Sequence, residues 1–260
     1  MLSNKIVVVT GGSSGLGKAI ALQAARKHAT VVVMARNLEA LRQVQAQASA
    51  WSGRPAFAYA VDVSDPTSID ACVQRLQTEV GTPDVLVNAA GFGRFENALA
   101  TDFKVIQKMF ATNVLGLMYL TQVIGRMMIA QHAGHIINVA SMAGLMATPK
   151  SAVYAATKFA VVGFDNGLRL ELKPFGVNVT TVNPGPINTN FFKVADATAY
   201  QQSVQAIALD PDRLAQRIVR AMGHRVREIN APRFMALAAK GYTLMPQVGD
   251  LLAGGIFNRK

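Results

Sequence analysis

Short apolar runs alternate along the chain with longer segments in which apolar residues recur every three or four positions. The short runs are rich in valine and isoleucine, as in buried strands, whereas the longer segments have the period of helices. The expected strands are 5–10, 30–35, 56–61, 84–88, 135–140, 177–182 and 227–230. The expected helices are 18–26, 37–52, 67–80, 102–130, 151–172 and 211–222. Strands that alternate with helices predict an α/β fold, a doubly wound parallel sheet of about seven strands flanked by helices.

Length and composition favour one domain. The chain has 260 residues, 51% of them hydrophobic, and no low-complexity linker divides it. The single cysteine, Cys72, excludes an internal disulfide and a multi-cysteine metal site. The four histidines have no metal-ligand spacing, so no metal is expected.

Charge and hydropathy bear on location and partners. The chain begins without the layout of a signal peptide, and no apolar stretch reaches the roughly 18 residues that span a bilayer, so we expect a cytoplasmic protein. The net charge is +11, and residues 213–260 carry nine basic residues against two acids. No basic run is interleaved with aromatic residues, so nucleic-acid binding is not expected. A weak peripheral contact between the basic C-terminal segment and a membrane surface is left open.

A glycine-rich turn joins the first expected strand to the first expected helix. Such a turn lets the backbone approach a pyrophosphate, and the helix N-terminus supplies free N–H groups. The spacing is Gly-x-x-x-Gly-x-Gly, and a plain structural turn is the alternative. The candidate cofactor residues here are Gly11, Ser13, Ser14, Gly15, Leu16 and Gly17.

The end of the second strand indicates which nicotinamide cofactor is preferred. An NAD site has Asp or Glu there to bond the ribose 2′-hydroxyl, whereas this chain has Ala35, Arg36 and Asn37. The Arg36 guanidinium suits a 2′-phosphate, which predicts NADP(H), with a solvated surface arginine as the alternative. Asp62 and Val63 follow the third strand, where the adenine is expected.

A hydroxyl, a phenol and an ammonium group form the candidate catalytic set. Ser141 follows a buried strand, and Tyr154 and Lys158 are four positions apart, so they share one helix face. A free tyrosine has a pKa of about 10, and a fixed cation nearby shifts it down by about one to three units. Taken alone, the Tyr154–Lys158 pair also fits an ordinary exposed helix face. Asn113, in the expected helix 102–130, is a candidate only because it occurs together with these residues.

These motifs occur together in one order, and the chain resembles the short-chain dehydrogenase/reductase family over residues 3 to about 195. The motifs are Thr10-Gly-x-x-x-Gly-x-Gly17, Asn88-Ala-Ala-Gly91, Asn113, Ser141, Tyr154-x-x-x-Lys158 and Pro184-Gly185 with Thr189. The resemblance implies a Rossmann fold in which Tyr154 is the acid/base and Ser141 holds the substrate carbonyl. It implies that Lys158 binds the nicotinamide ribose and lowers the Tyr154 pKa, with Asn113 beside a proton-relay water.

The resemblance also assigns further cofactor contacts. Asn88 would lie beside the adenosine ribose, and Ile187 and Thr189 would meet the carboxamide. The remaining residues assigned to this site are Ala89, Ala90, Gly91, Pro184 and Gly185. Ser14 departs from the family pattern, because NADP(H)-preferring members often have a second basic residue there, so selectivity would rest mainly on Arg36.

The predicted activity is that of an NADP(H)-dependent oxidoreductase that interconverts a ketone or aldehyde and an alcohol. Residues 190–260 would form a substrate-specific lid and C-terminal extension, which could also be a dimer-packing element. This extension contains two expected apolar segments with basic ends, 232–240 and 244–257. The pocket candidates, which indicate a mostly apolar and bulky substrate, are Phe92, Arg94, Met142, Leu145, Met146, Phe191 and Phe192. The C-terminal extension loosely resembles that of short-chain reductases acting on lipid-like ketones, which implies a lipid-like substrate. A non-catalytic NADPH-binding or scaffolding member is the alternative. Long helices apolar on more than one face predict a homodimer or homotetramer.

Overall fold

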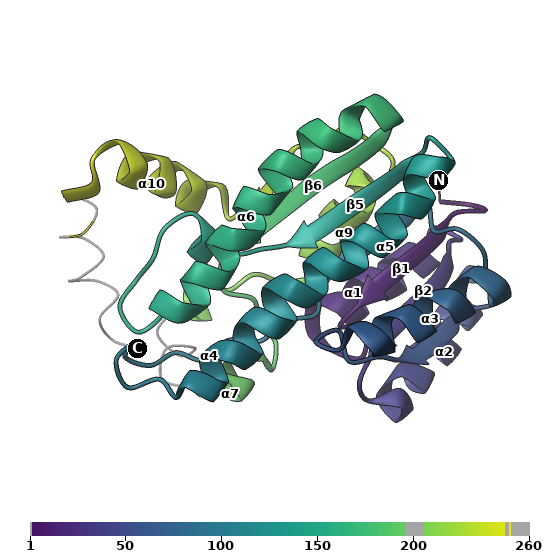
Figure 1. The fold of residues 1–260 in the computed structure, drawn as a ribbon, viewed down its shortest axis with the longest axis horizontal. Helices are drawn as coiled ribbons and strands as arrows, with labels where there is room; N and C mark the ends of the chain where they lie inside the picture. The colour runs from purple at the N-terminus through teal and green to yellow at the C-terminus, as the bar shows by residue number, and fades with distance from the viewer. Residues whose placement is uncertain (1, 196–204, 248–249, 251–260) are drawn as a thin grey trace.

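A seven-stranded parallel sheet forms the centre of the molecule in this computed structural model, which describes residues 2–195, 205–247 and 250 (Figure 1). The strands are β1 (Ile6–Thr10), β2 (Thr30–Ala35), β3 (Phe57–Ala60), β4 (Val85–Asn88), β5 (Gly134–Val139), β6 (Val177–Pro184) and β7 (Glu228–Ala231). Their order is β3-β2-β1-β4-β5-β6-β7, and every neighbouring pair is parallel. The expected doubly wound parallel sheet is confirmed.

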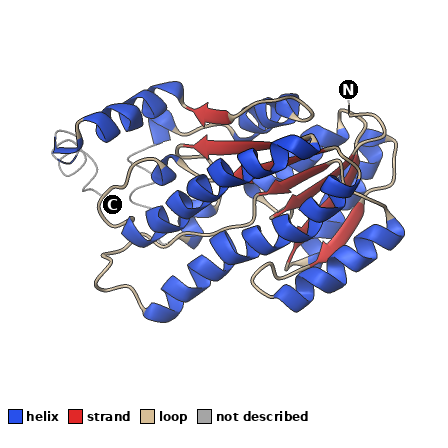
Figure 2. Cartoon of the chain, turned by 45° about the horizontal axis from the view of Figure 1, so that its top comes forward, coloured by secondary structure: helices blue, strands red, loops and turns tan. Residues whose placement is uncertain are grey.

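Helices cover both faces of the sheet (Figure 2). On one face lie α1 (Gly15–Ala25), α2 (Leu38–Ser52) and α9 (Pro211–Ala221). On the other lie α3 (Pro66–Glu79), α4 (Phe103–Phe110), α5 (Leu117–Ala130) and α6 (Ala152–Leu172). Beyond β7 follows α10 (Arg233–Leu244), and the short helical elements are α7 (Phe191–Val194), η1 (Ala111–Gly116), η2 (Met142–Gly144), η3 (Lys173–Phe175) and η4 (Gln205–Ile207).

The two hydrophobic cores follow from the alternation of side chains along each strand. On β1, Val7 and Val9 pack against the α1 face, while Val8 between them packs against the α3 face. All three are fully buried, and so is Leu86 on the adjacent β4. Because both faces of a parallel sheet are covered, its strands are continuous apolar runs, which explains why these segments could be found by pattern.

The expected helix 102–130 is divided in the structure. It consists of α4, the π-helical η1 and α5, which follow one another directly. At Gly116, at the end of η1, a Cβ atom would come within 1.9 Å of the Val63 carbonyl oxygen. The irregular segment therefore lies where the helix passes very close to the loop after β3.

The expectation that no apolar stretch is long enough to span a bilayer is wrong for the same segment. Among the described residues, Phe103–Ala130 is long and apolar enough to do so, with a mean hydropathy of 1.2. Half of that apolar window is buried inside the molecule, as in the core helix of a globular protein. The mean stays high although polar residues interrupt the apolar run, which is why a search for continuous runs missed it.

Element boundaries differ from expectation mainly near the ligand-binding edge. α1 begins at Gly15, so the last glycines of the motif form its first turn, and β6 extends through Pro184, which pairs with Ala231 on β7. α10 continues to Leu244, further than the apolar segment expected at 232–240. Most of the apolar segment expected at 244–257 lies outside the described residues.

Candidate active site

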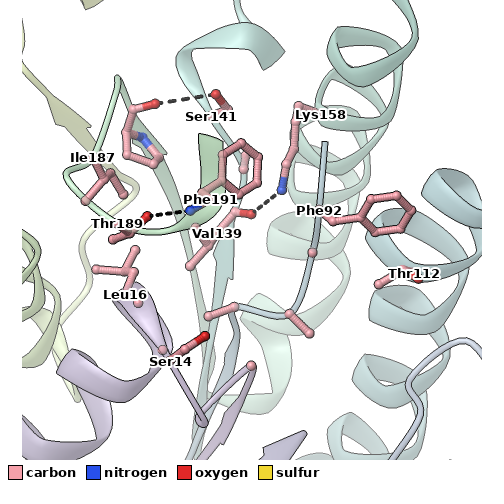
Figure 3. Close-up of a pocket in the computed structure, with 18 of the residues that line it drawn as sticks. Ser14, Leu16, Phe92, Thr112, Val139, Ser141, Lys158, Ile187, Thr189 and Phe191 are labelled. Carbon is pink, nitrogen blue, oxygen red and sulfur yellow. Dashed lines mark hydrogen bonds between the residues drawn. The ribbon is translucent and has the colours of Figure 1, made fainter. Parts of the chain in front are cut away.

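A cavity of about 510 Å³ opens at the carboxyl ends of the strands, where the chain order of the sheet reverses between β1 and β4 (Figure 3). This topological switch point is where ligands bind in open α/β sheets, because the loops after the two neighbouring strands diverge there. The predicted cofactor residues that line it are Gly11, Ser13, Ser14, Gly15, Leu16, Gly17, Arg36, Asn37, Asp62, Val63, Ala89, Ala90, Gly91, Tyr154, Lys158, Pro184, Gly185, Ile187 and Thr189. Of the predicted cofactor residues, Asn88 alone does not line the cavity.

The glycine-rich turn fits a close approach by the backbone. Gly11 and Gly15 have φ angles of 66° and 52°, which side-chain-bearing residues rarely adopt. At Gly17 a Cβ atom would lie 2.4 Å from the Gly11 carbonyl oxygen, so only glycine lets α1 start so close to the turn. The free N–H groups of the first turn of α1 then face the cavity, which suits a pyrophosphate. The residues present therefore fit a dinucleotide.

Thr10 joins the glycine-rich turn to the small-residue turn after β4. Its buried hydroxyl accepts hydrogen bonds from the N–H groups of both Ala89 and Ala90, at 3.0 Å each. Gly91, in the same small-residue turn, also has little space for a side chain, because a Cβ atom there would lie 3.0 Å from Asn113 Oδ1 and 3.7 Å from Lys158 Nζ. Small residues in this turn keep the floor of the cavity open.

At the adenosine end, Arg36 is exposed and lines the cavity beside Ala35. Asn37 caps α2, since its Oδ1 accepts from the Ala40 N–H at 3.0 Å. Hydrogen bonds from the side chain and backbone of Ser64 hold the Asp62 pKa below its usual value, and the Arg36 charge acts in the same direction. Arg36 thus lies close enough to Asp62 to lower the pKa of its carboxyl group, at the end of the cavity where the adenosine is expected.

Ser141, Tyr154 and Lys158 all line this cavity. Ser141 Oγ donates to the Pro184 carbonyl oxygen at 3.4 Å and accepts from the Ala143 N–H at 3.1 Å. Lys158 Nζ donates to the Val139 carbonyl oxygen at 2.9 Å, the bond drawn in Figure 3, and lies 5.8 Å from the centre of the Tyr154 ring. Phenol, hydroxyl and ammonium therefore face one space.

The protonation states differ from the sequence-based expectation. Burial raises the pKa of Tyr154 to about 12, and only a hydrogen bond with Ser141 acts against it. Burial also lowers the pKa of Lys158 to about 8, while Asp165 opposes this shift. The Tyr154 pKa is therefore raised overall, where the sequence predicted that it would be lowered, because burial disfavours the charged phenolate. At neutral pH both groups hold their protons.

Asn113 and Asn88 lie behind the cavity. Asn113 Oδ1 accepts from the Phe92 N–H, and its Nδ2 donates to the Phe92 carbonyl oxygen and to Thr157 Oγ1, at 3.0, 2.8 and 3.2 Å. It therefore ties the loop after β4 to α6 beside Lys158. Asn88 Nδ2 donates to Thr121 Oγ1 and Asn138 Oδ1, so its side chain joins β4 to β5 and α5. The position beside the adenosine ribose expected for Asn88 is not where its side chain lies.

The substrate end of the cavity is apolar and aromatic. Of the pocket candidates, Phe92, Met142, Met146, Phe191 and Phe192 line it, whereas Arg94 and Leu145 do not. Sequence reasoning missed Phe95, whose ring centre lies 5.4 Å from that of Tyr154, and Met235 of α10, which packs against Gly185. Neither residue belongs to a motif; the apolar character of 232–240 was the only signal for Met235.

Among the residues that the structure describes, no group of three or more His, Cys, Asp or Glu side chains is arranged so that it could hold a metal ion.

Comparisons with known proteins agree with this geometry. The family model for short chain dehydrogenases matches residues 5–199. An uncharacterised oxidoreductase of Staphylococcus aureus (strain MW2) is 35% identical over 224 residues, which are 85% of this chain and 92% of that protein.

Solved structures resemble the whole fold. A short-chain dehydrogenase from Streptomyces avermitilis has a TM-score of 0.83 and 28% identity, with 96% of each chain covered. L-Sorbose reductase from Gluconobacter frateurii, in complex with NADPH and L-sorbose, has a TM-score of 0.81 and 28% identity, over 88% of this chain and 95% of that one. A 3-ketoacyl-(acyl-carrier-protein) reductase from Brucella melitensis, in complex with NADH, has a TM-score of 0.81 and 26% identity, over 89% and 98%. The protein therefore belongs to the short-chain dehydrogenase/reductase family of oxidoreductases.

Proposed function

We propose that this protein is an NADP(H)-dependent reductase that interconverts a ketone or aldehyde and the corresponding alcohol. The observation that carries the proposal is that Ser141, Tyr154 and Lys158 line one cavity with the glycine-rich turn of a dinucleotide site. A non-catalytic cofactor-binding protein would have no need for a buried phenol, an ammonium and a hydroxyl in that position.

Tyr154 acts as the proton donor when a carbonyl is reduced. A nicotinamide cofactor held at the glycine-rich turn would supply the hydride, and the Tyr154 phenol would give its proton to the carbonyl oxygen. A pKa of about 12 keeps this phenol protonated at neutral pH, the form that reduction requires. Ser141 donates a hydrogen bond to the same oxygen, and the Lys158 ammonium stabilises the phenolate that remains. In the alcohol-oxidising direction the proton returns to Tyr154.

Preference for NADP(H) over NAD(H) rests on Arg36. Arg36 lines the cavity where the adenosine ribose is expected, next to Ala35, which stands in place of an acid that would repel a 2′-phosphate. Among the similar structures, both NADPH and NADH occur as bound cofactors, so the fold by itself does not select one.

The lining of the cavity supports an apolar, bulky and lipid-like substrate. Two phenylalanine rings contact Tyr154, with ring centres 5.4 Å away for Phe95 and 5.8 Å away for Phe191. The Phe192 ring packs against both of these phenylalanines, at 6.1 and 5.6 Å. Met142, Met146 and Met235 add flexible apolar surface that adapts to irregular shapes.

The test is NADPH oxidation, followed by absorbance, against a panel of ketones and aldehydes that includes long-chain 3-keto lipids. Tyr154→Phe keeps the ring and removes the proton, so turnover should fall by about two to four orders of magnitude. Tyr119→Phe is the matched control, since that phenol only bonds to Asp70 on the surface. More than a tenth of wild-type turnover in Tyr154→Phe would show that the phenol is not the acid.

We also propose a homodimer or homotetramer that functions in the cytoplasm. Large apolar side chains stay exposed on α4, η1 and α6, namely Phe103, Leu115, Phe159 and Leu170. Near the C-terminus of the chain, α10 exposes Phe234, Leu237 and Leu244 beside the cations Arg233 and Lys240. These residues are suited to a weak contact between the basic C-terminal segment and an anionic membrane surface.

A further inference from the structure

Asp165 is a fully buried carboxylate that the proposed reaction does not use. It lies on α6, is 0% exposed, and both of its oxygens accept hydrogen bonds. Asn138 Nδ2 donates to Oδ1 at 2.5 Å, and Thr181 Oγ1 donates to Oδ2 at 2.7 Å. An ionised group so far from water costs free energy, which hydrogen bonds and nearby opposite charges must offset.

Asp165 and Lys158 belong to the same helix face. They are seven residues apart, which is about two turns or roughly 10 Å along the helix axis. Both side chains reach β5 at consecutive residues, since Asp165 accepts from Asn138 and Lys158 donates to the carbonyl oxygen of Val139. The end of β5, which carries Ser141 two residues later, is therefore held to α6 by an anion and a cation.

We propose that Asp165 is a positioning residue for Lys158. The Asp165 carboxylate keeps the buried Lys158 side chain charged, and it fixes the end of β5, to which the Lys158 side chain is bonded. The inference rests on the proposed reaction, because it assigns Asp165 a role in the electrostatics of that site. Asp165 acts through Lys158 and touches neither substrate nor cofactor.

The charges around Asp165 agree with this role. Burial raises its pKa to about 6, against hydrogen bonds from Asn138 and Thr181 and the positive charges of Arg169 and Lys158, so it is ionised at neutral pH. Asp165 in turn raises the Lys158 pKa against burial. Arg169, one turn further along α6, donates to Thr181 Oγ1 and faces Arg227 and Glu228 of the β7 edge. β5 and β6 present only the neutral Asn138 and Thr181 to the carboxylate.

The experiment measures the Lys158 titration directly, with protein labelled with ¹³C at lysine Cε and the resonance assigned by its loss in Lys158→Met. Asp165→Asn removes the charge and keeps the shape. At roughly 10 Å, loss of one charge should lower the Lys158 pKa by about one pH unit from its wild-type value near 8. Thr181→Val is the matched control, because it removes the hydrogen bond that Thr181 donates to Asp165 but leaves the Asp165 charge in place. The Lys158 pKa should therefore not fall in this variant.

A second measurement needs no variant at Asp165. In the wild-type protein the Lys158 resonance should show an additional inflection near pH 6, where Asp165 itself ionises. An unchanged Lys158 titration in Asp165→Asn, an equal fall in Thr181→Val, or no inflection near pH 6 in the wild type would overturn the proposal. Because neither readout uses turnover, a protein inactive on every ketone would contradict the proposed function and leave this inference standing.

Discussion

Burial decides the chemistry of individual residues at this site. Tyr154 and Lys158 carry the spacing of a catalytic pair, yet the low-dielectric surroundings raise the pKa of one and lower that of the other. The result is a protonated phenol beside an ammonium that titrates near pH 8, which suits proton donation during reduction. The protonation of Lys158 should therefore set the upper pH limit for carbonyl reduction at this site.

We expect kcat/KM for carbonyl reduction, at saturating NADPH, to be level below about pH 8 and to fall above it. The Lys158 pKa of about 8 lies below the ordinary lysine value, so the ammonium form is present below pH 8 and is lost as pH rises. Above that point the decline approaches tenfold per pH unit. Initial rates measured from pH 6 to pH 10 test this, and a level profile up to pH 10 would contradict it.

Cofactor choice also belongs to single residues. A charge-assisted hydrogen bond from Arg36 to a 2′-phosphate contributes roughly 1.5–3 kcal/mol, which is about ten- to more than a hundredfold preference for NADPH. With Ser14 in place of a second basic residue, we expect the lower half of that range. Ala35→Asp combined with Arg36→Ile should reverse the preference, because it adds an acid that repels phosphate and bonds the ribose.

The measurement is the ratio of kcat/KM for NADPH and NADH at fixed ionic strength, in the wild type and the double variant. Arg42→Ile is a suitable control, since Arg42 is an exposed arginine on α2 that does not line the cavity. A wild type that prefers NADH would show that Arg36 does not bind the cofactor.

Among the elements, the start of α1 is the most tightly constrained. Gly17 brings the helix so close to the turn after β1 that no side chain fits, and Thr10 holds the neighbouring turn after β4 in place. The cofactor cradle is thus one packed unit of two strands, two turns and a helix. A change of one methyl group should be enough to disturb it.

Gly17→Ala and Gly163→Ala form a matched pair of helical substitutions. At Gly17 the new methyl group would lie 2.4 Å from the Gly11 carbonyl oxygen, so we expect the melting temperature and NADPH affinity both to fall. At Gly163, in α6, nothing lies within 4 Å, so alanine should stabilise the helix by about 0.5–1 kcal/mol. Thermal melts and cofactor fluorescence titrations check both, and equal effects would contradict the argument.

For the whole molecule, the exposed apolar face of α4, η1 and α6 is the main feature left unexplained by a single chain. Phe103, Leu115 and Leu170 are 68, 62 and 72% exposed, although these helices pack on the core with their other faces. Burial of such side chains against a second copy would remove apolar surface from water. This surface is the place to test the oligomer.

We expect a dimeric or tetrameric mass by light scattering at micromolar concentration. Leu115→Glu together with Leu170→Glu should shift the mass towards the monomer, because buried carboxylates without partners are costly. The matched control is Leu99→Glu, at a residue that is 99% exposed in the loop before α4. A monomeric wild type would contradict the proposed assembly.

The amino-acid sequence by itself determined the fold class, the strands and the placement of Tyr154 and Lys158 on one helix face. These depend on local periodicity: alternating burial marks each strand of a covered sheet, and a four-residue spacing places two side chains on one helix face. Only the tertiary structure decided which residues meet across the cavity. It brought Phe95 and Met235 to the substrate end and left Asn88 and Asn113 behind the floor. It also decided the pKa values, because burial depends on packing between segments far apart in the chain, which no local pattern encodes.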